Sequence, residues 1–243
     1  MTDQEELAVF FIVARKGISS TCILIVCALI KKPPFCPLLD IGQQTGYNRF
    51  MSSILDLPEV RERVSRVSVA EYHRMGEFNE DRRRTELIQG IVIEKLSKTA
   101  LHRRLAMRLY QIIAACAPAD FFVMKEEPLT LHDSEPEPDV SVIAGNEDDF
   151  FSKHPETAAL VVEVAVSSPA LDRANAPLYA EAGVLEYWIV LGREQRIEVY
   201  RQPVSGQYEQ KLIVSRGQSL ECASVPGVTV DLDALFAKPP GVE

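Results

Sequence analysis

Two acidic residues lie at apolar segments whose length is typical of β-strands. Asp139 is followed by Val-Ser-Val-Ile, and Glu163 lies inside Ala-Leu-Val-Val-Glu-Val-Ala-Val. Short runs rich in Val, Ile and Leu predict strands, and an ionised acid inside an apolar strand is costly unless its charge is compensated. One divalent cation would compensate both acids, since Mg²⁺ and Mn²⁺ prefer hard oxygen ligands such as carboxylates, water and phosphate. The pair therefore indicates a metal site for phosphodiester chemistry, with Asp139 and Glu163 as the metal ligands.

The same two acids also have an ordinary structural interpretation. Asp139 would cap a turn, and Glu163 would face solvent on a strand at the edge of the sheet. Buried charges that are paired within a protein are common outside functional sites as well. The two residues by themselves leave both interpretations open.

Several further segments match, in order along the chain, the segments of one protein family. They are Val69-Ala-Glu-Tyr72, Thr85-Glu86-Leu-Ile-Gln-Gly90, Leu101-His102, Ser134-Glu-Pro-Glu-Pro-Asp139, Leu160-Val-Val-Glu163-Val and Leu178-Tyr-Ala-Glu-Ala-Gly-Val-Leu-Glu-Tyr-Trp-Ile-Val190. This series resembles the Uma2 family, which is grouped with restriction endonucleases. The resemblance runs from Val67 to Phe236 and includes both acids of the candidate site.

The resemblance implies an α/β fold with a restriction-endonuclease-like mixed β-sheet flanked by helices. It implies that Asp139 and Glu163 lie on adjacent core strands and bind Mg²⁺ or Mn²⁺, that Glu86 is a third acid near them, and that the protein is a metal-dependent endonuclease acting on nucleic acid, with DNA as the expected substrate. His102 would orient a phosphate or act as a base, because a histidine can be charged or neutral near neutral pH. The alternative for His102 is a solvent-facing residue at the start of a helix.

The chain departs from the family pattern at four positions. The family usually has a lysine in the helix before Leu-Tyr, and Asn175 stands at that position here. A lysine would stabilise hydroxide or phosphate as a positive point charge, which a neutral amide cannot do. Arg173 is the nearby residue that could partly substitute. The other three departures replace acidic residues, by Ile91, Val166 and Leu191. They support a second hypothesis, a catalytically degenerate module that keeps the fold and binds protein or nucleic acid.

Composition limits the classes of function. The 243 residues carry a formal net charge of −9, which argues against broad electrostatic attraction to nucleic acid, because that attraction needs Lys and Arg to neutralise phosphates. A local basic cleft remains compatible with this total. A group of basic residues surrounds Glu86 and His102 in the sequence, and it would form either such a cleft or a solvated helix face. Its members are Arg82, Arg83, Arg84, Lys95, Lys98, Arg103, Arg104 and Arg108.

The chain has five cysteines, Cys22, Cys27, Cys36, Cys116 and Cys222, none in a CxxC pair. The odd number and the spacing argue against a zinc site or a disulfide framework and favour a reducing cytoplasm. We expect a cytoplasmic protein without a stable membrane span, and a homodimer is the assembly left open.

Residues 1–50 differ from the rest of the chain. The apolar run from Thr21 to Ile30 is too short to span a bilayer, and three prolines follow it between residues 33 and 37. We interpret this part as a poorly defined extension, produced by an over-long gene start with Met51 as the alternative start. A short membrane-surface anchor is the other interpretation of this segment. The segment also raises the hypothesis that the whole chain is an unexpressed or misannotated product. Residues 67–236 form the predicted endonuclease-like domain.

The elements of that domain follow from capping signals and periodicity. Ser68 and Glu71 predict a capped helix, and Gln89-Gly90 predicts a hairpin turn. A helix is predicted over 99–115, a second one over 169–182 closed by Gly183, and Trp188 is expected to be buried against the Leu178–Tyr179 part of that second helix. Strands are predicted over 121–125, 128–131, 139–144, 160–166, 187–191, 197–201 and 208–214, with a closing strand and helical turn between 225 and 236.

Overall fold

The structure, a computed structural model, describes residues 57–76, 84–167, 169–238 and 241. The chain divides into two compact units, residues 1–61 and residues 62–243. Within the first unit the described part holds one short helix, α1 (Pro58–Arg61). The prediction for residues 1–50 falls outside the described residues. Everything below concerns the second unit.

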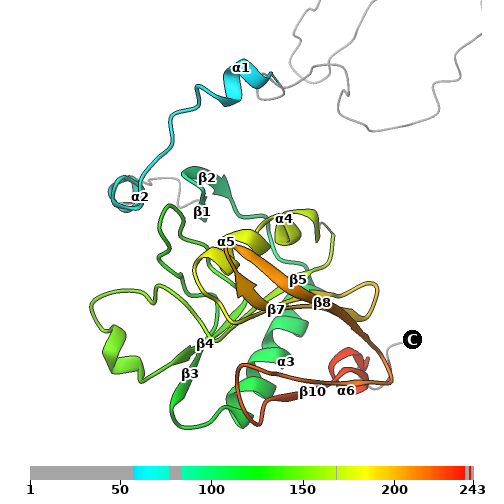
Figure 1. The fold of residues 1–243 in the computed structure, drawn as a ribbon. Coiled ribbons are helices and arrows are strands. Elements are labelled where there is room, and N and C mark those ends of the chain that lie inside the picture. Colours follow the sequence, from blue (N-terminus) through cyan, green and yellow to red (C-terminus); the bar gives the residue numbers. More distant parts are fainter. Residues whose placement is uncertain (1–56, 77–83, 168, 239–240, 242–243) are drawn as a thin grey trace, which may run out of the picture. The chain divides into compact units, whose positions relative to one another are not determined.

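The centre of this unit is a sheet of six strands in the order β3-β4-β5-β6-β7-β8 (Figure 1). The strands β5 and β6 pair in parallel, and the other neighbours pair antiparallel. A mixed sheet with helices on both faces is the predicted fold class, which is thereby confirmed. The strands are β3 (Phe121–Met124), β4 (Val140–Ala144), β5 (Leu160–Ala165), β6 (Glu186–Leu191), β7 (Arg196–Val204) and β8 (Gln207–Ser215).

Helices cover the two faces of the sheet and create two cores. The long helix α3 (Ala100–Cys116) and the short α6 (Leu232–Phe236) pack with one face, and α5 (Ala176–Glu181), with α4 (Pro169–Ala174) before it, packs on the other. All six residues of β6 are buried, as expected for a central strand covered on both sides. The parallel pair β5–β6 needs a helical crossover between its strands, which α4 and α5 supply.

Smaller elements surround the sheet. The helix α2 (Val69–Gly76) begins at the predicted capping box, in which Ser68 and Glu71 exchange hydrogen bonds. The predicted hairpin is formed by β1 (Thr85–Ile88) and β2 (Ile91–Glu94). Its turn residues Gln89 and Gly90 both have positive φ angles, of 49° and 74°, which suits a tight hairpin turn. The remaining elements are the 3₁₀ helix η2 (Glu147–Phe150) and the strand pair β9 (Ser219–Glu221) and β10 (Thr229–Asp231).

Two predictions about elements were wrong. Residues 128–131 are not a strand, because their backbone folds back on the following loop, with Leu129 N–H donating to Pro136 O and Leu131 N–H to Ser134 O. The predicted helix over 169–182 is two helices that meet at Asn175. Pro177 lacks the N–H that would continue the helical hydrogen bonds across this point.

The position of Trp188 is also a correction. Its side chain is fully buried as predicted, but it packs in the core beneath α3, whereas Leu178 and Tyr179 belong to the core on the opposite face. Alternate residues of a strand point to opposite faces, so Tyr187 and Ile189 contact the α5 side instead. The indole N–H donates to Oε1 of Glu186 over 2.7 Å.

Among the helices of the described residues, none has both the length and the apolar character needed to cross a lipid bilayer.

Candidate active site

A pocket of about 240 Å³ lies where the hairpin, the start of α3, the ends of β4 and β5, and α4 meet. All five residues singled out from the sequence line it, namely Glu86, His102, Asp139, Glu163 and Asn175. Its volume has room for several water molecules. The structure therefore brings the predicted site residues together, although they come from five different elements or their ends.

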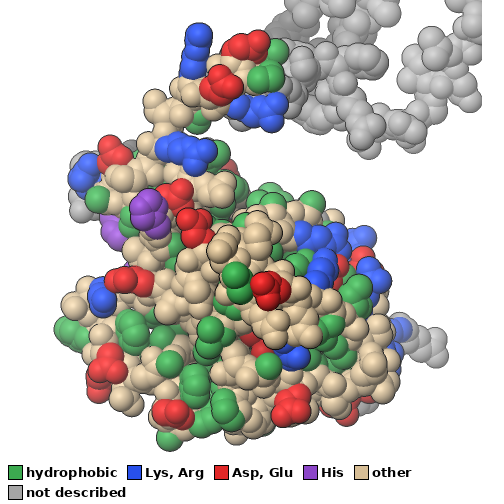
Figure 2. Space-filling view, viewed as in Figure 1, with side chains coloured by type: hydrophobic (Ala, Val, Ile, Leu, Met, Phe, Trp, Pro, Cys, Tyr) green, Lys and Arg blue, Asp and Glu red, His purple; other side chains and the backbone are tan. Residues whose placement is uncertain are grey.

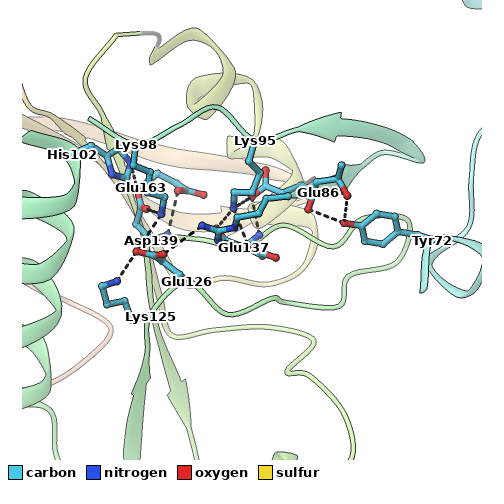
Figure 3. A network of polar contacts seen from close by, with 12 residues as sticks. Tyr72, Glu86, Lys95, Lys98, His102, Lys125, Glu126, Glu137, Asp139 and Glu163 are labelled. Atoms are coloured by element: carbon cyan, nitrogen blue, oxygen red, sulfur yellow. Dashed lines mark hydrogen bonds and ion pairs between the residues drawn. The ribbon is translucent and has the colours of Figure 1, made fainter. Parts of the chain in front are cut away.

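Asp139 immediately precedes β4 and is 3% exposed. Its Oδ2 atom accepts a hydrogen bond from the backbone N–H of Val164 at 2.8 Å and lies 3.0 Å from Nε2 of His102. Its Oδ1 atom lies 2.8 Å from Nζ of Lys98 (Figure 3). Burial acts to raise the pKa of this carboxyl, but the hydrogen bonds and charges of His102 and Lys98 outweigh it and hold the pKa below its usual value. Asp139 is thus an ionised acid whose charge is compensated by its neighbours.

Glu163 lies in β5, between β4 and β6, so its interpretation as a solvent-facing residue on an edge strand was wrong. Its Oε1 atom accepts a hydrogen bond from the hydroxyl of Tyr179 at 3.0 Å, and its Oε2 atom lies 3.4 Å from the backbone N of Asp139. Burial, together with the negative charges of Asp139, Asp172 and Glu86, raises the pKa of Glu163 well above its usual value. The carboxylate form of Glu163 therefore needs an additional positive charge.

Glu86 is the second residue of β1 and is held by the neighbouring strand and loop. Its Oε1 atom accepts hydrogen bonds from Nζ of Lys95 and from the backbone N–H of Glu137, the latter at 3.1 Å. The same Lys95 ammonium lies 3.0 Å from the carbonyl oxygen of Glu137 and 3.2 Å from its Oε2 atom. Figure 3 shows this group beside the Asp139 group, on the hairpin side of the pocket.

His102 lies in the first turn of α3, where Thr99 caps the helix by accepting the His102 backbone N–H at 3.2 Å. This cap directs the imidazole to Asp139, and only 15% of the side chain is exposed. The alternative of a solvent-facing histidine was therefore wrong. Within the described residues the Nδ1 atom is buried without a hydrogen-bond partner.

Asn175 is 6% exposed and lies between α4 and α5. Its amide lines the pocket, at the place where the family resemblance predicts a lysine. The nearby Arg173 does not substitute for that charge, because its guanidinium pairs with Glu198 at 2.6 Å and it is not among the residues that line the pocket. No cation of α4 or α5 therefore reaches the candidate site within the described residues.

The other three departures from the family pattern are not gathered at one place. Val166 lines the pocket. Ile91 is 49% exposed on the hairpin, and Leu191 is fully buried in the core beside α5. Only two of the four departures, Asn175 and Val166, lie at the candidate site. The hypothesis of a catalytically degenerate site is therefore supported by two substitutions at the pocket, and not by four.

Sequence reasoning assigned no role to several residues that line the pocket. Lys95 and Lys98 were noticed only as members of a basic group, and Asp172 and Glu137 were not singled out. Burial and the charges of Asp139 and Glu86 raise the pKa of Asp172 to about 6. A signal for the two lysines was present, since both lie between the Glu86 and His102 segments, on the connection from hairpin to helix.

Arg104 and Arg108, two further members of the basic group, have a structural role. Arg104 and Arg108 donate hydrogen bonds to backbone carbonyls at the end of α6 and just beyond it, including the carbonyl of Ala237 at 2.7 and 2.9 Å. Arg84 is largely exposed and pairs with Glu137, and residues 82 and 83 lie outside the described part. On the face shown in Figure 2, one group of Lys and Arg side chains lies at the right, further Lys and Arg side chains lie singly elsewhere, and acidic side chains are scattered among them.

The donor set of the pocket fits a small divalent cation. Mg²⁺ is commonly held by one or two carboxylates, with water and substrate phosphate as its other ligands, and Asp139 and Glu163 offer two adjacent carboxyl groups, one of which lacks compensation. In the described part of the chain no three His, Cys, Asp or Glu side chains are arranged around a common point as ligands. The fit therefore rests on the two carboxylates, with solvent and substrate completing the shell.

The chain is similar to a known family and to solved structures. The family model of Uma2, described as "Putative restriction endonuclease", matches residues 69–233. A crystal structure of "a putative nuclease belonging to DUF820" from Anabaena variabilis ATCC 29413 is similar with a TM-score of 0.60 and 16% sequence identity, and the match covers 70% of this chain and 97% of that chain. At this identity the similarity shows the fold alone. A comparison with curated proteins finds no match.

Proposed function

Because the chain belongs to the Uma2 family, we propose that it hydrolyses phosphodiester bonds in nucleic acid, with DNA as the expected substrate. The reaction would depend on Mg²⁺ or Mn²⁺ held by Asp139 and Glu163. The observation that carries this proposal is that one pocket is lined by both carboxyl groups, of Asp139 just before β4 and of Glu163 within the adjacent strand β5. The raised pKa of Glu163 supports it, because a bound cation would supply the missing charge.

A divalent cation at this place would lower the pKa of a bound water and neutralise charge on the phosphate. The chain's own residues hold the carboxyl groups in position. Val164 and His102 fix one oxygen of Asp139, and the buried hydroxyl of Tyr179 fixes one oxygen of Glu163. Glu86 and Lys95 form the neighbouring wall of the pocket. Fixed dipoles and charges of this kind favour a charged transition state, since they need no reorganisation during the reaction.

The test is cleavage of a plasmid and of a labelled oligonucleotide by the purified full chain with Mg²⁺, with Mn²⁺ and with EDTA. We expect cleavage with either cation and none with EDTA. Glu163→Gln keeps the side-chain shape but removes the charge, and it should abolish cleavage. Glu156→Gln is the matched control, because Glu156 is 69% exposed and pairs only with Lys153 in the described structure. Equal background cleavage by the wild type, Glu163→Gln and Glu156→Gln would refute the nuclease proposal.

Two observations favour a second candidate, a nucleic-acid-binding module without catalysis. The pocket has Asn175 where the family has a lysine, and Asp139 is already compensated by Lys98 and His102. Under this alternative the protein would bind labelled DNA with similar affinity in EDTA and in Mn²⁺, and it would leave the DNA intact. Fluorescence anisotropy on the same oligonucleotide distinguishes the two candidates.

A further inference from the structure

Lys98 places a positive charge beside the candidate metal ligand Asp139, which the neutral Asn175 does not do. It lies on the connection between the hairpin and α3, with a side chain that is 20% exposed and lines the pocket. Its Nζ atom lies 2.8 Å from Oδ1 of Asp139 and 3.3 Å from Oε1 of Glu126. Figure 3 shows Lys98 above Asp139, with Glu126 on the other side of that carboxylate and Lys125 beyond it.

The two oxygens of Asp139 are engaged in different ways. Oδ2 is held by the backbone N–H of Val164 and by His102, which both belong to regular elements. Oδ1 is held by the ammonium of Lys98, on a flexible four-carbon side chain. A cation that binds Asp139 through Oδ1 would therefore compete with the Lys98 ammonium for that oxygen.

We propose that Lys98 is a displaceable counter-ion of Asp139 which, when a divalent cation occupies the site, moves to the phosphate of the bound nucleic acid. This inference rests on the proposed function. Before the cation binds, Lys98 offsets the charge of the buried Asp139. After it binds, the same ammonium is free to pair with a phosphate oxygen beside the site, as a compact point charge. Glu126 lies close enough to hold the ammonium between these two positions.

The other cations nearby are not free to take this role. Lys95 is bound by three oxygen atoms of Glu86 and Glu137, and its side chain is only 13% exposed. Arg173 is bound by Glu198 outside the pocket. Among these three cations, only Lys98 contacts an oxygen of the candidate metal ligands.

The inference predicts effects of opposite sign when Lys98 is replaced. Lys98→Met removes the competing ammonium, so the affinity of the full chain for Mn²⁺, measured by calorimetry without nucleic acid, should increase roughly tenfold. The same change removes the charge from the phosphate, so cleavage at saturating Mn²⁺ should fall roughly a hundredfold. Lys98→Arg keeps the charge and should leave the Mn²⁺ affinity close to that of the wild type. Lys153→Met, at an exposed lysine outside the pocket, should change neither quantity.

The outcomes separate this inference from the proposed function. Unchanged or weaker Mn²⁺ binding by Lys98→Met would overturn the inference, whether or not the wild type cleaves DNA. If the wild type cleaves DNA, an equal rate of cleavage by Lys98→Met at saturating Mn²⁺ would also overturn the inference, because Lys98 would then have no role at the phosphate. Tighter Mn²⁺ binding by Lys98→Met, with no cleavage by the wild type, would support the counter-ion role and refute the nuclease proposal alone. Circular dichroism checks folding, and Lys98→Gln replaces Lys98→Met if the latter does not fold.

Discussion

The backbone N–H of Val164 donates a hydrogen bond to Oδ2 of Asp139 over 2.8 Å. Asp139, a candidate metal ligand, therefore also has a structural role, because this hydrogen bond connects the start of β4 to the adjacent strand β5. The bond is buried. A substitution of Asp139 is therefore expected to change the stability of the protein as well as its activity.

Asp139→Ala should lower the free energy of unfolding by about 1–3 kcal/mol, because it leaves the buried N–H of Val164 without an acceptor. Asp139→Asn keeps an oxygen that can accept this bond and should cost less. Urea unfolding followed by circular dichroism measures both. Equal losses for the two variants would show that the hydrogen bond to Val164 contributes little.

Asp172→Asn should stabilise the protein at neutral pH. The pKa of Asp172 is raised from 3.8 to about 6, so the folded state binds this proton more tightly than the unfolded state does. The free energy of unfolding of the wild type therefore falls as the pH rises through this window. The variant avoids this loss, and we expect a gain of about 1–2 kcal/mol at pH 8 that disappears below about pH 4. A gain that is the same at both pH values would contradict the assignment.

Glu198→Gln should have the opposite effect. Hydrogen bonds from Arg173, with further ones from Lys211 and Tyr200, lower the pKa of the buried Glu198 from 4.5 to about 2. A lowered pKa adds stability above the unfolded value, and this contribution is lost as the pH falls from 4.5 towards 2. The variant should be less stable by about 2 kcal/mol at pH 7, with allowance for the half-exposed partners. Thermal unfolding at pH 7 and pH 2.5 should show a much larger difference at the higher pH.

Binding of Mn²⁺ should release protons. The pKa of Glu163 is raised well above its usual value, and a metal ligand must be deprotonated. The apparent affinity for Mn²⁺ should therefore increase with pH until Glu163 is ionised in the metal-free protein. Calorimetry in two buffers with different ionisation enthalpies measures the released protons directly. Glu163→Gln should lose both the proton release and most of the affinity.

Asn175→Lys should increase the rate of DNA cleavage with Mn²⁺. Asn175 lines the pocket, and a lysine there would place a cation where water screens charges poorly. If Lys98 already serves the phosphate, the increase should be small in the wild type and larger in the background of Lys98→Met. Plasmid cleavage by the four combinations measures this coupling, and identical increases in both backgrounds would mean that the two positions act independently.

Much of the architecture followed from local patterns. The capping box at Ser68, the turn at Gln89-Gly90 and the cap at Thr99 each lie at the boundary that the sequence indicated, because capping and tight turns depend on residues that are close in the chain. The wrong predictions have different causes. The break at Asn175 lies beside Pro177, a local signal that the helix prediction did not use. The burial of Trp188 beneath α3 depends on how the helices pack on the two faces of the sheet, which local propensity does not determine.

The sequence by itself indicated the family, the mixed sheet and the five residues that meet in one pocket. Acids at apolar runs indicated Asp139 and Glu163, because buried charges must be compensated, whereas the resemblance to Uma2 implied Glu86, His102 and the position of Asn175. Only the tertiary structure decided which cations compensate these acids. Lys95 and Lys98 pair with carboxylates dozens of residues away, at Glu137 and Asp139, whereas Arg173 turns to Glu198 instead of the pocket. Such pairings depend on the direction of each side chain after the hairpin, α3 and α4 have packed against the sheet, and spacing along the chain does not encode that direction.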